Sequence, residues 1–393
     1  MTDLPVLDAP ARAQSERLVA VIRDEIAAAG GWIPFHRYME LALYAPGLGY
    51  YSGGARKFGV GGDFVTAPEI TPLFGQALAA QVADVLRASS PEVIEIGAGS
   101  GLLAIDLLLE LERLGCAPRR YGILEVSPDL RARQRENIFE RIPALAPRVQ
   151  WLDALPETFS GVVVANEVLD AMPLHALAWR NGEIYERGVV ASSGMTAHPF
   201  RWSNRPACDA VLAAAQKLPL SAPLDTPDDE YLTEINLAAA AWIGLWGKIL
   251  QRGALLLIDY GYPRAEYYLP ARSRGTLNCH FRQRVHDDPF QWPGLMDITA
   301  SVDFTAMAEA GYDAGLDVLG YVSQGRFLMN CGILECLARR ELQSNARYLR
   351  AVRAVERLTS PREMGETFKV LALGKNISMP LVGFASGDRT HTL

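Results

Sequence analysis

The feature that most constrains the fold is a short apolar segment that runs directly into a glycine-rich turn. Residues 92–96 read EVIEI, residues 97–101 read GAGSG, and a helix-length segment follows to about Leu114. Glycines between a strand and a helix let the backbone turn tightly and let a ligand approach without obstruction by Cβ atoms. The segment therefore predicts a strand–turn–helix unit of an α/β fold.

Further short apolar runs follow at helix-length intervals along the chain. We expect strands at residues 121–126, 149–152, 161–165 and 254–259, and a last one at 368–373. These runs are continuously apolar, which is typical of parallel strands covered by helices on both faces. The sequence thus predicts a Rossmann-like, mostly parallel sheet with helices on both faces.

The segments outside this alternation have other patterns. Apolar residues at helical spacing predict helices over 15–29, ending at a Gly-Gly pair, and over 72–88. Asn181-Gly182 between apolar pairs predicts a hairpin, because Asn-Gly suits a type I′ turn. A long helix is expected from Thr226 to about Gly253, followed by an irregular polar stretch over 262–293.

These patterns suggest three regions. The first is an N-terminal helical and glycine-rich loop region at 1–90. The second is an α/β core formed by 91–175 and 254–380. The third, at 176–253, is an insertion that contains the hairpin and the long helix.

Composition and charge narrow the classes of function. The formal net charge is −7, and 49% of the residues are hydrophobic, so a globular protein is expected and a nucleic-acid partner is not. No apolar run approaches the roughly 20 residues needed to cross a bilayer. The first ten residues carry no Lys or Arg, so neither a secretory signal nor an Arg-rich transit peptide is expected. We expect a cytoplasmic protein without membrane insertion, and a homodimer is left open.

Metal ions and disulfides are not expected. The five cysteines are scattered and form no C-x-x-C pair. His280 and His286 share one polar stretch, but their spacing matches no standard ligand pattern. The chain also lacks a G-x-S-x-G motif and a P-loop, which argues against a serine hydrolase or a kinase-type NTPase.

The glycines and two acidic residues suggest a ligand. A dinucleotide fingerprint needs its third glycine at position 102, which is Leu, whereas Gly97, Gly99 and Gly101 have the spacing G-x-G-x-G. Preceded by Glu95, this spacing fits a nucleoside without a pyrophosphate, as in S-adenosylmethionine (SAM) enzymes. Glu125, at the end of the second strand, is predicted to accept hydrogen bonds from the ribose hydroxyls. The alternatives are a glycine turn without a ligand and a solvated glutamate at a strand end.

Acidic residues also follow the strand at 161–165. Asn166, Glu167 and Asp170 come at the carboxyl end of that strand, where α/β folds bind ligands. Two carboxylates there can hold a guanidinium and orient its nitrogen for in-line methyl transfer. The alternative is a helix N-terminus, where acidic residues are favoured by the helix dipole.

The loop at 61–69 offers two more carboxylates. Asp63 or Glu69 is predicted to contact the amino group of the cofactor, or the substrate. An ordinary turn before the helix at 72–88 is the alternative.

Several of these segments together resemble one family. It is the MidA-like family of SAM-dependent methyltransferases, which is related to the mitochondrial assembly-factor methyltransferase of respiratory complex I. The resemblance runs from about Gly30 to Lys375 and is carried by GGDFVTAPEI, EIGAGSG, ILEVSPDLRARQ, VVANEVLDAMPLHAL, IDYG, GTLNCHFRQRVHDDP and PGLMDITASVDF.

The resemblance implies a class I methyltransferase core and SAM as cofactor. It also implies symmetric dimethylation of an arginine on a 49-kDa-type subunit of complex I, or on its bacterial counterpart. Asn166 and Glu167 would border the methyl-transfer site, with Asp170 beside the guanidinium. The expected cofactor contacts are Glu95, Gly97, Gly99, Gly101, Glu125, Ser127, Asp153 and Asn166, with Asp63, Thr66 and Glu69 in a loop that closes over the site.

Two alternatives stay open on the sequence alone. One is a methyltransferase with a small-molecule substrate. The other is a catalytically silent assembly chaperone that uses the cofactor only for stability. An NAD-dependent oxidoreductase is disfavoured by Leu102.

Overall fold

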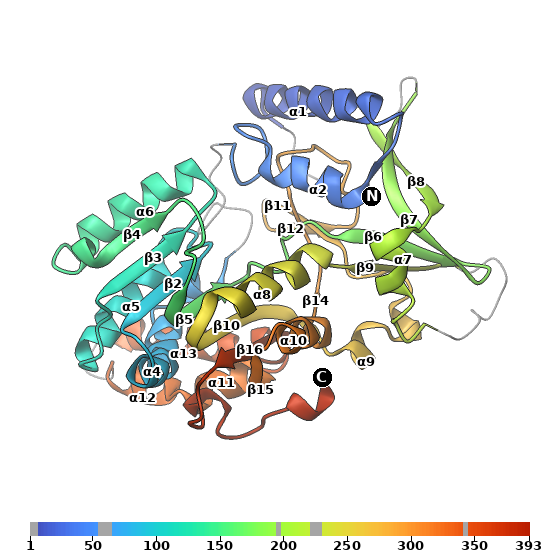
Figure 1. The fold of residues 1–393 in the computed structure, drawn as a ribbon. Coiled ribbons are helices and arrows are strands. Elements are labelled where there is room, and N and C mark those ends of the chain that lie inside the picture. Colours follow the sequence, from blue (N-terminus) through green and yellow to red (C-terminus); the bar gives the residue numbers. More distant parts are fainter. Residues whose placement is uncertain (1–6, 54–64, 194–197, 221–229, 341–344) are drawn as a thin grey trace. The chain divides into compact units, whose positions relative to one another are not determined.

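The computed structural model describes residues 7–53, 65–193, 198–220, 230–340 and 345–393. The chain forms two compact units that alternate along the sequence (Figure 1). The first comprises Met1–Phe64, Asp170–Ala239 and Arg264–Asp303, and the second comprises Val65–Leu169, Ala240–Pro263 and Phe304–Leu393.

These units differ from the regions that we predicted. The helix at 73–88 packs with the α/β core, because its apolar face belongs to the same hydrophobic cluster as the central strands. Residues 264–303 belong to the same compact unit as the N-terminal region and most of the insertion.

A mostly parallel sheet forms the centre of the second unit. Its strand order is β15-β16-β10-β5-β2-β3-β4. The neighbours from β10 to β4 are parallel, whereas β16 is antiparallel to both β10 and β15. The fold class is confirmed, and every predicted strand is present: β2 (Glu92–Ile96), β3 (Arg120–Leu124), β4 (Val149–Leu152), β5 (Phe159–Asn166), β10 (Leu250–Tyr262) and β16 (Phe368–Lys375), with β15 (Asp317–Ser323) in addition.

Both faces of the central strands are buried. Val162 and Val164 lie in one cluster with the helix α4 (Leu73–Ala88), whereas Val163 faces the opposite side and is also fully buried. This explains the continuously apolar strands of the sequence. The other helices of the unit are α3 (Ala67–Ile70), α5 (Leu102–Arg113), α6 (Pro128–Arg141), α10 (Phe304–Asp313), α11 (Gln324–Asn330), α12 (Ile333–Ala338), α13 (Asn345–Thr359) and α14 (Met364–Thr367), together with most of α8 (Leu237–Ile249).

The first unit is dominated by antiparallel strands. One sheet has the order β1-β7-β6-β9, with β8 paired to β7, and a smaller one has the order β12-β11-β13. The predicted hairpin is confirmed, because Asn181 and Gly182 have φ values of 53° and 78° between β6 and β7. The elements are α1 (Ala9–Ala28), β1 (Ile33–Pro34), α2 (Phe35–Tyr44), β6 (His175–Arg180), β7 (Glu183–Ala191), β8 (Phe200–Pro206), α7 (Asp209–Ala215), β9 (Tyr231–Ile235), α9 (Arg264–Tyr267), β11 (Asn278–Phe281), β12 (Arg284–His286) and β13 (Asp297–Thr299).

Two predictions for this part of the chain were wrong. The long helix begins only at Leu237, as α8 (Leu237–Ile249), and its expected start at 226–229 lies outside the described residues. Residues 231–235 form β9 instead, because they pair with β6, and Asn236 then accepts the Ala239 N–H at the helix start. The stretch at 262–293 is also more regular than expected, because β11 and β12 pair as a hairpin within it.

Candidate functional site

The glycine turn after β2 has a backbone conformation that would be strained for any residue other than glycine. Gly97, Gly99 and Gly101 have φ values of 64°, 54° and 82°, a region that glycine adopts at little cost. A Cβ atom on Gly97 would lie 3.3 Å from Val168 Cγ2, and one on Gly101 would lie 3.4 Å from Gln134. The turn thus has no Cβ atom at three of its five positions, at the carboxyl end of β2 and just before α5.

Glu125 is held in place after β3. Its side chain is 7% exposed, so the alternative of a solvated glutamate is wrong. Its Oε1 accepts from the Ser127 N–H at 3.0 Å, and its Oε2 accepts from Gln134 Nε2 at 3.0 Å. These two bonds orient the carboxylate.

Gln134, on α6, joins three parts of this site and was not predicted. Its side chain is fully buried. Besides the bond to Glu125, its Nε2 donates to the Gly99 carbonyl at 3.0 Å, and its Oε1 accepts from Trp151 Nε1 at 2.9 Å. Gln134 therefore couples the glycine turn, the β3 acid and the end of β4. A single glutamine on an otherwise charged helix gives no sequence signal for such a role.

The loop before α4 also reaches the glycine turn. Ser100 Oγ donates to Glu69 Oε1, and the Ser100 carbonyl accepts from Asn137 Nδ2 at 2.8 Å. Thr66 occupies the N-cap position of α3, where its side chain forms no capping bond. Asp63 lies outside the described residues. The Glu69 side chain thus contacts the turn.

Three other predicted contacts have different surroundings. The Glu95 carboxylate is buried and accepts from the Tyr121 hydroxyl at 2.6 Å. Burial raises the Glu95 pKa to about 7, while the Tyr121 bond lowers it and the nearby Glu125 raises it further. Ser127 caps α6, because its Oγ accepts from the Leu130 N–H at 3.4 Å. Asp153 points to solvent, with its side chain 87% exposed and paired with Arg131 at 2.7 Å.

Glu167, the first residue after β5, has an unusual backbone. Its φ is 53°, a left-handed value that is uncommon for residues other than glycine and is often found at functional sites. Its N–H donates to the Ile258 carbonyl at 2.8 Å, and its Oε1 accepts from Asn166 Nδ2 at 3.1 Å. Residues 167–174 form turns and bends, so the alternative of a helix N-terminus is wrong.

Asp259, on β10, fixes this turn and was missed as a site residue. Its buried Oδ2 accepts from the N–H groups of Val168 and Leu169 at 3.2 and 3.0 Å. Its Oδ1 accepts from the Tyr260 N–H at 2.9 Å. These bonds oppose the relaxation of Glu167 toward an unstrained backbone. The only signal in the sequence was the position of Asp259 near the end of the fifth predicted strand.

Asp170, the other predicted carboxylate, belongs to the first unit. It is buried, and its backbone carbonyl accepts from the Ala300 N–H at 3.1 Å. Asn166 and Glu167 are therefore the two predicted transfer-site residues that belong to the same unit as the glycine turn.

One group of side chains among the described residues has the spacing of metal ligands. It consists of His36, His175 and Glu186, all in the first unit. His280 and His286 are described on β11 and β12 but do not belong to such a group. In the part of the chain that the structure describes, no helix is long and apolar enough to span a membrane.

Comparison with known proteins gives one consistent picture. A model of a family of S-adenosyl-L-methionine-dependent methyltransferases matches residues 77–322. The protein arginine methyltransferase NDUFAF7 homolog of Drosophila melanogaster mitochondria is 30% identical, over 94% of this chain and 88% of its own. The human NDUFAF7 protein is 27% identical, over 87% of this chain and 80% of its own.

A solved structure resembles the whole chain. It is the crystal structure of a Burkholderia thailandensis protein bound to S-adenosyl-homocysteine. That protein is 51% identical, each chain covers 100% of the other, and the TM-score is 0.94.

Proposed function

The chain belongs to the family of S-adenosyl-L-methionine-dependent methyltransferases, and from this premise we propose that it methylates an arginine side chain of a protein. The family, the fold and the cofactor are established by the comparisons above. The substrate and the residues that act on it are the subject of the proposal.

The residues of the second unit fit this cofactor. The glycine turn gives it space, and the buried Glu125 gives an acceptor for its ribose hydroxyls. Ser127 and Gln134 would hold that acceptor in place before the cofactor arrives, which lowers the cost of binding. When bound, SAM supplies an electrophilic methyl group on a sulfonium. The remaining task of the protein is to position a nucleophile.

The observation that carries the proposal is the conformation of Glu167. A residue with φ of 53° has a strained backbone, and such strain costs about 1–3 kcal/mol. It persists here because Asp259 binds the next two N–H groups and because the Glu167 N–H is bonded to β10. A carboxylate placed at this cost at the end of β5 is suited to bind a cationic substrate group.

A guanidinium is the substrate group that fits best. A carboxylate binds it through two parallel, charge-assisted hydrogen bonds, which fix the plane of the group and the direction of the reacting nitrogen. The names of the relatives as protein arginine methyltransferases support this choice. The Asn166 amide, bonded to Glu167 Oε1, would hold the carboxylate in its rotamer.

The test separates cofactor binding from methyl transfer. Glu167→Gln keeps the shape of the side chain but removes its charge. We expect its SAM affinity to stay within about threefold of wild type, while transfer of a radioactive methyl group to a proteome from cells lacking the protein falls by at least about 10²-fold. Glu112→Gln is the matched control, because Glu112 is an exposed residue of α5. Amino-acid analysis of the labelled proteins identifies the methylated residue.

The outcomes distinguish the alternatives. Label in methylarginine that depends on Glu167 supports the proposal, and symmetric dimethylarginine on a 49-kDa-type complex I subunit, or its bacterial counterpart, would support the specific target that we propose. Radioactive label found only in small molecules would instead favour a methyltransferase with a small-molecule substrate. Cofactor binding without any transfer would leave the silent chaperone as the better account.

A further inference from the structure

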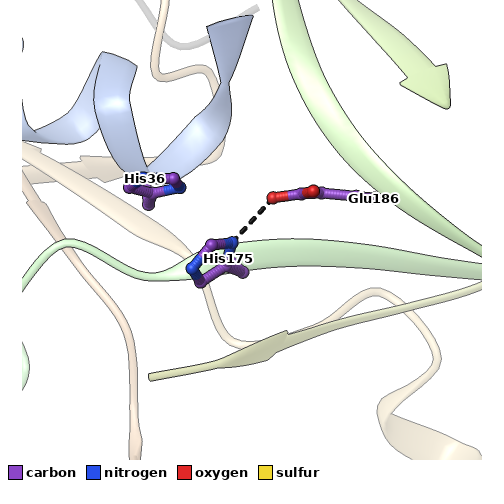
Figure 2. A group of neighbouring side chains, drawn as sticks. All are labelled: His36, His175 and Glu186. Carbon is purple, nitrogen blue, oxygen red and sulfur yellow. Dashed lines mark hydrogen bonds and ion pairs between the residues drawn. The ribbon is translucent and has the colours of Figure 1, made fainter. Parts of the chain in front are cut away.

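We infer that the first unit contains a binding site for a divalent transition-metal ion, formed by His36, His175 and Glu186. The three side chains come from α2, β6 and β7, and Figure 2 shows them facing one another. Their candidate ligand atoms all lie within 4.8 Å of one another. The glycine turn and Glu125 belong to the other unit, so this site is separate from the cofactor-binding residues.

The β-hairpin creates the first half of the site. In the pairing of β6 with β7, Leu177 lies opposite Glu186. His175 precedes Leu177 by two residues, so it is the diagonal neighbour of Glu186 on the same face of the sheet. The two side chains are in contact, with His175 Nδ1 2.7 Å from Glu186 Oε1.

The helix α2 adds the third side chain. Pro34 precedes the helix as its N-cap residue, and His36 follows in the first turn. The His36 ring lies against the His175 ring, with 4.2 Å between their centroids. His36 is far from His175 and Glu186 in the sequence, so no local motif could have indicated the group.

A ring nitrogen of His36 supports a metal ion at this position. Its Nδ1 atom is buried and has no hydrogen-bond partner among the residues that the structure describes. Leaving a buried polar atom without a partner costs about 1–3 kcal/mol. A metal ion bound by the group would interact with this imidazole.

The donor set indicates the class of metal. Two imidazole nitrogens and one carboxylate oxygen are common ligands of Zn²⁺, and three protein ligands leave a fourth position for water. Ligand atoms about 2.0–2.1 Å from a tetrahedral zinc lie about 3.4 Å apart, so small side-chain rotations bring the group to that spacing. Glu186 is 8% exposed, and a bound cation would compensate for the burial of its charge.

The test is metal binding by the full-length protein after treatment with a chelator. We expect one equivalent of Zn²⁺ per chain in competition with a chromophoric chelator. Co²⁺ should give the visible absorption of a tetrahedral site with nitrogen ligands. His36→Ala and Glu186→Gln should each weaken Zn²⁺ binding by at least about tenfold. His198→Ala is the control, because His198 is a partly exposed histidine outside this group that pairs with Asp288 at 3.2 Å, and this variant should bind like wild type.

Two results would overturn the inference. One is a wild type that binds no stoichiometric Zn²⁺. The other is a set of variants in which His36→Ala binds as tightly as His198→Ala. Loss of folding is recognised independently by circular dichroism and by S-adenosyl-homocysteine affinity, which reports on the other unit. The methyltransferase proposal does not depend on either result.

Discussion

Gln134 gives the sharpest test of how the cofactor residues are arranged. Gln134→Leu keeps a side chain of similar length and removes three hydrogen bonds, to Glu125, to the Gly99 carbonyl and from Trp151. The bond to Glu125 joins a neutral donor to a charged acceptor, and such bonds contribute about 1.5–3 kcal/mol. Because 1.4 kcal/mol corresponds to tenfold in affinity, we expect S-adenosyl-homocysteine to bind about 10- to 100-fold more weakly.

Isothermal titration calorimetry measures this effect directly, and two further variants control it. Asn137→Ala removes a hydrogen bond from the same helix to the same turn, at the Ser100 carbonyl, without touching Glu125. Its affinity should stay within about threefold of wild type, since the lost bond is neutral and part-exposed. Gln134→Glu should bind more weakly than Gln134→Leu, because it places a second carboxylate against Glu125.

Equal affinity of folded Gln134→Leu and wild type would refute the reasoning. It would mean that Glu125 needs no neighbouring donor to be positioned, or that it does not contact the cofactor. Glu125→Ala distinguishes these two cases. If only Glu125→Ala loses affinity, Glu125 contacts the cofactor but does not need Gln134 to be positioned.

Two other predictions concern stability and the glycine turn. Burial raises the Asp106 pKa to about 7 from 3.8, so the folded protein binds this proton more tightly than the unfolded chain, and stability falls as the pH rises from about 4 to 7. Asp106→Asn should therefore stabilise the protein at pH 8, by up to about 4 kcal/mol in chemical denaturation, and should change its stability little at pH 4. An equal effect at both pH values would contradict the raised pKa of Asp106. Gly97 and Gly115 have nearly equal φ values of 64° and 65°, so Gly97→Ala and its control Gly115→Ala should each cost about 1–2 kcal/mol of stability. Only Gly97→Ala should weaken cofactor binding, because Gly115 lies outside the glycine turn and a Cβ atom there would have no heavy atom within 4 Å. Calorimetric titration of both glycine variants with S-adenosyl-homocysteine checks this; an equal loss of affinity in both would contradict a specific role of the glycine turn.

Local patterns were enough to predict the core of the fold. The strand at 92–96, the glycine turn and the following helix depend on burial and on backbone freedom within about 20 residues, and all three are present. The same holds for the Asn181-Gly182 hairpin. Where one segment carries its own turn residues and its own apolar face, its conformation follows from its sequence.

Segments that depend on partners were predicted less well. Residues 231–235 became a strand because β6 offers them a paired edge, which no periodicity in that segment could indicate. The boundaries of the two units likewise depend on which buried faces meet and not on position along the chain.

The sequence by itself determined the α/β core, the cofactor class and the identity of Glu125 and Glu167 as candidate site residues, because each follows from residues that are adjacent in the chain. Only the tertiary structure revealed the buried Gln134 beside Glu125, and Asp259 holding the turn at Glu167. It likewise brought His36 to His175 and Glu186. Hydrogen bonds and metal ligands require atoms within a few ångströms, and for residues distant in the chain that proximity is created only by folding.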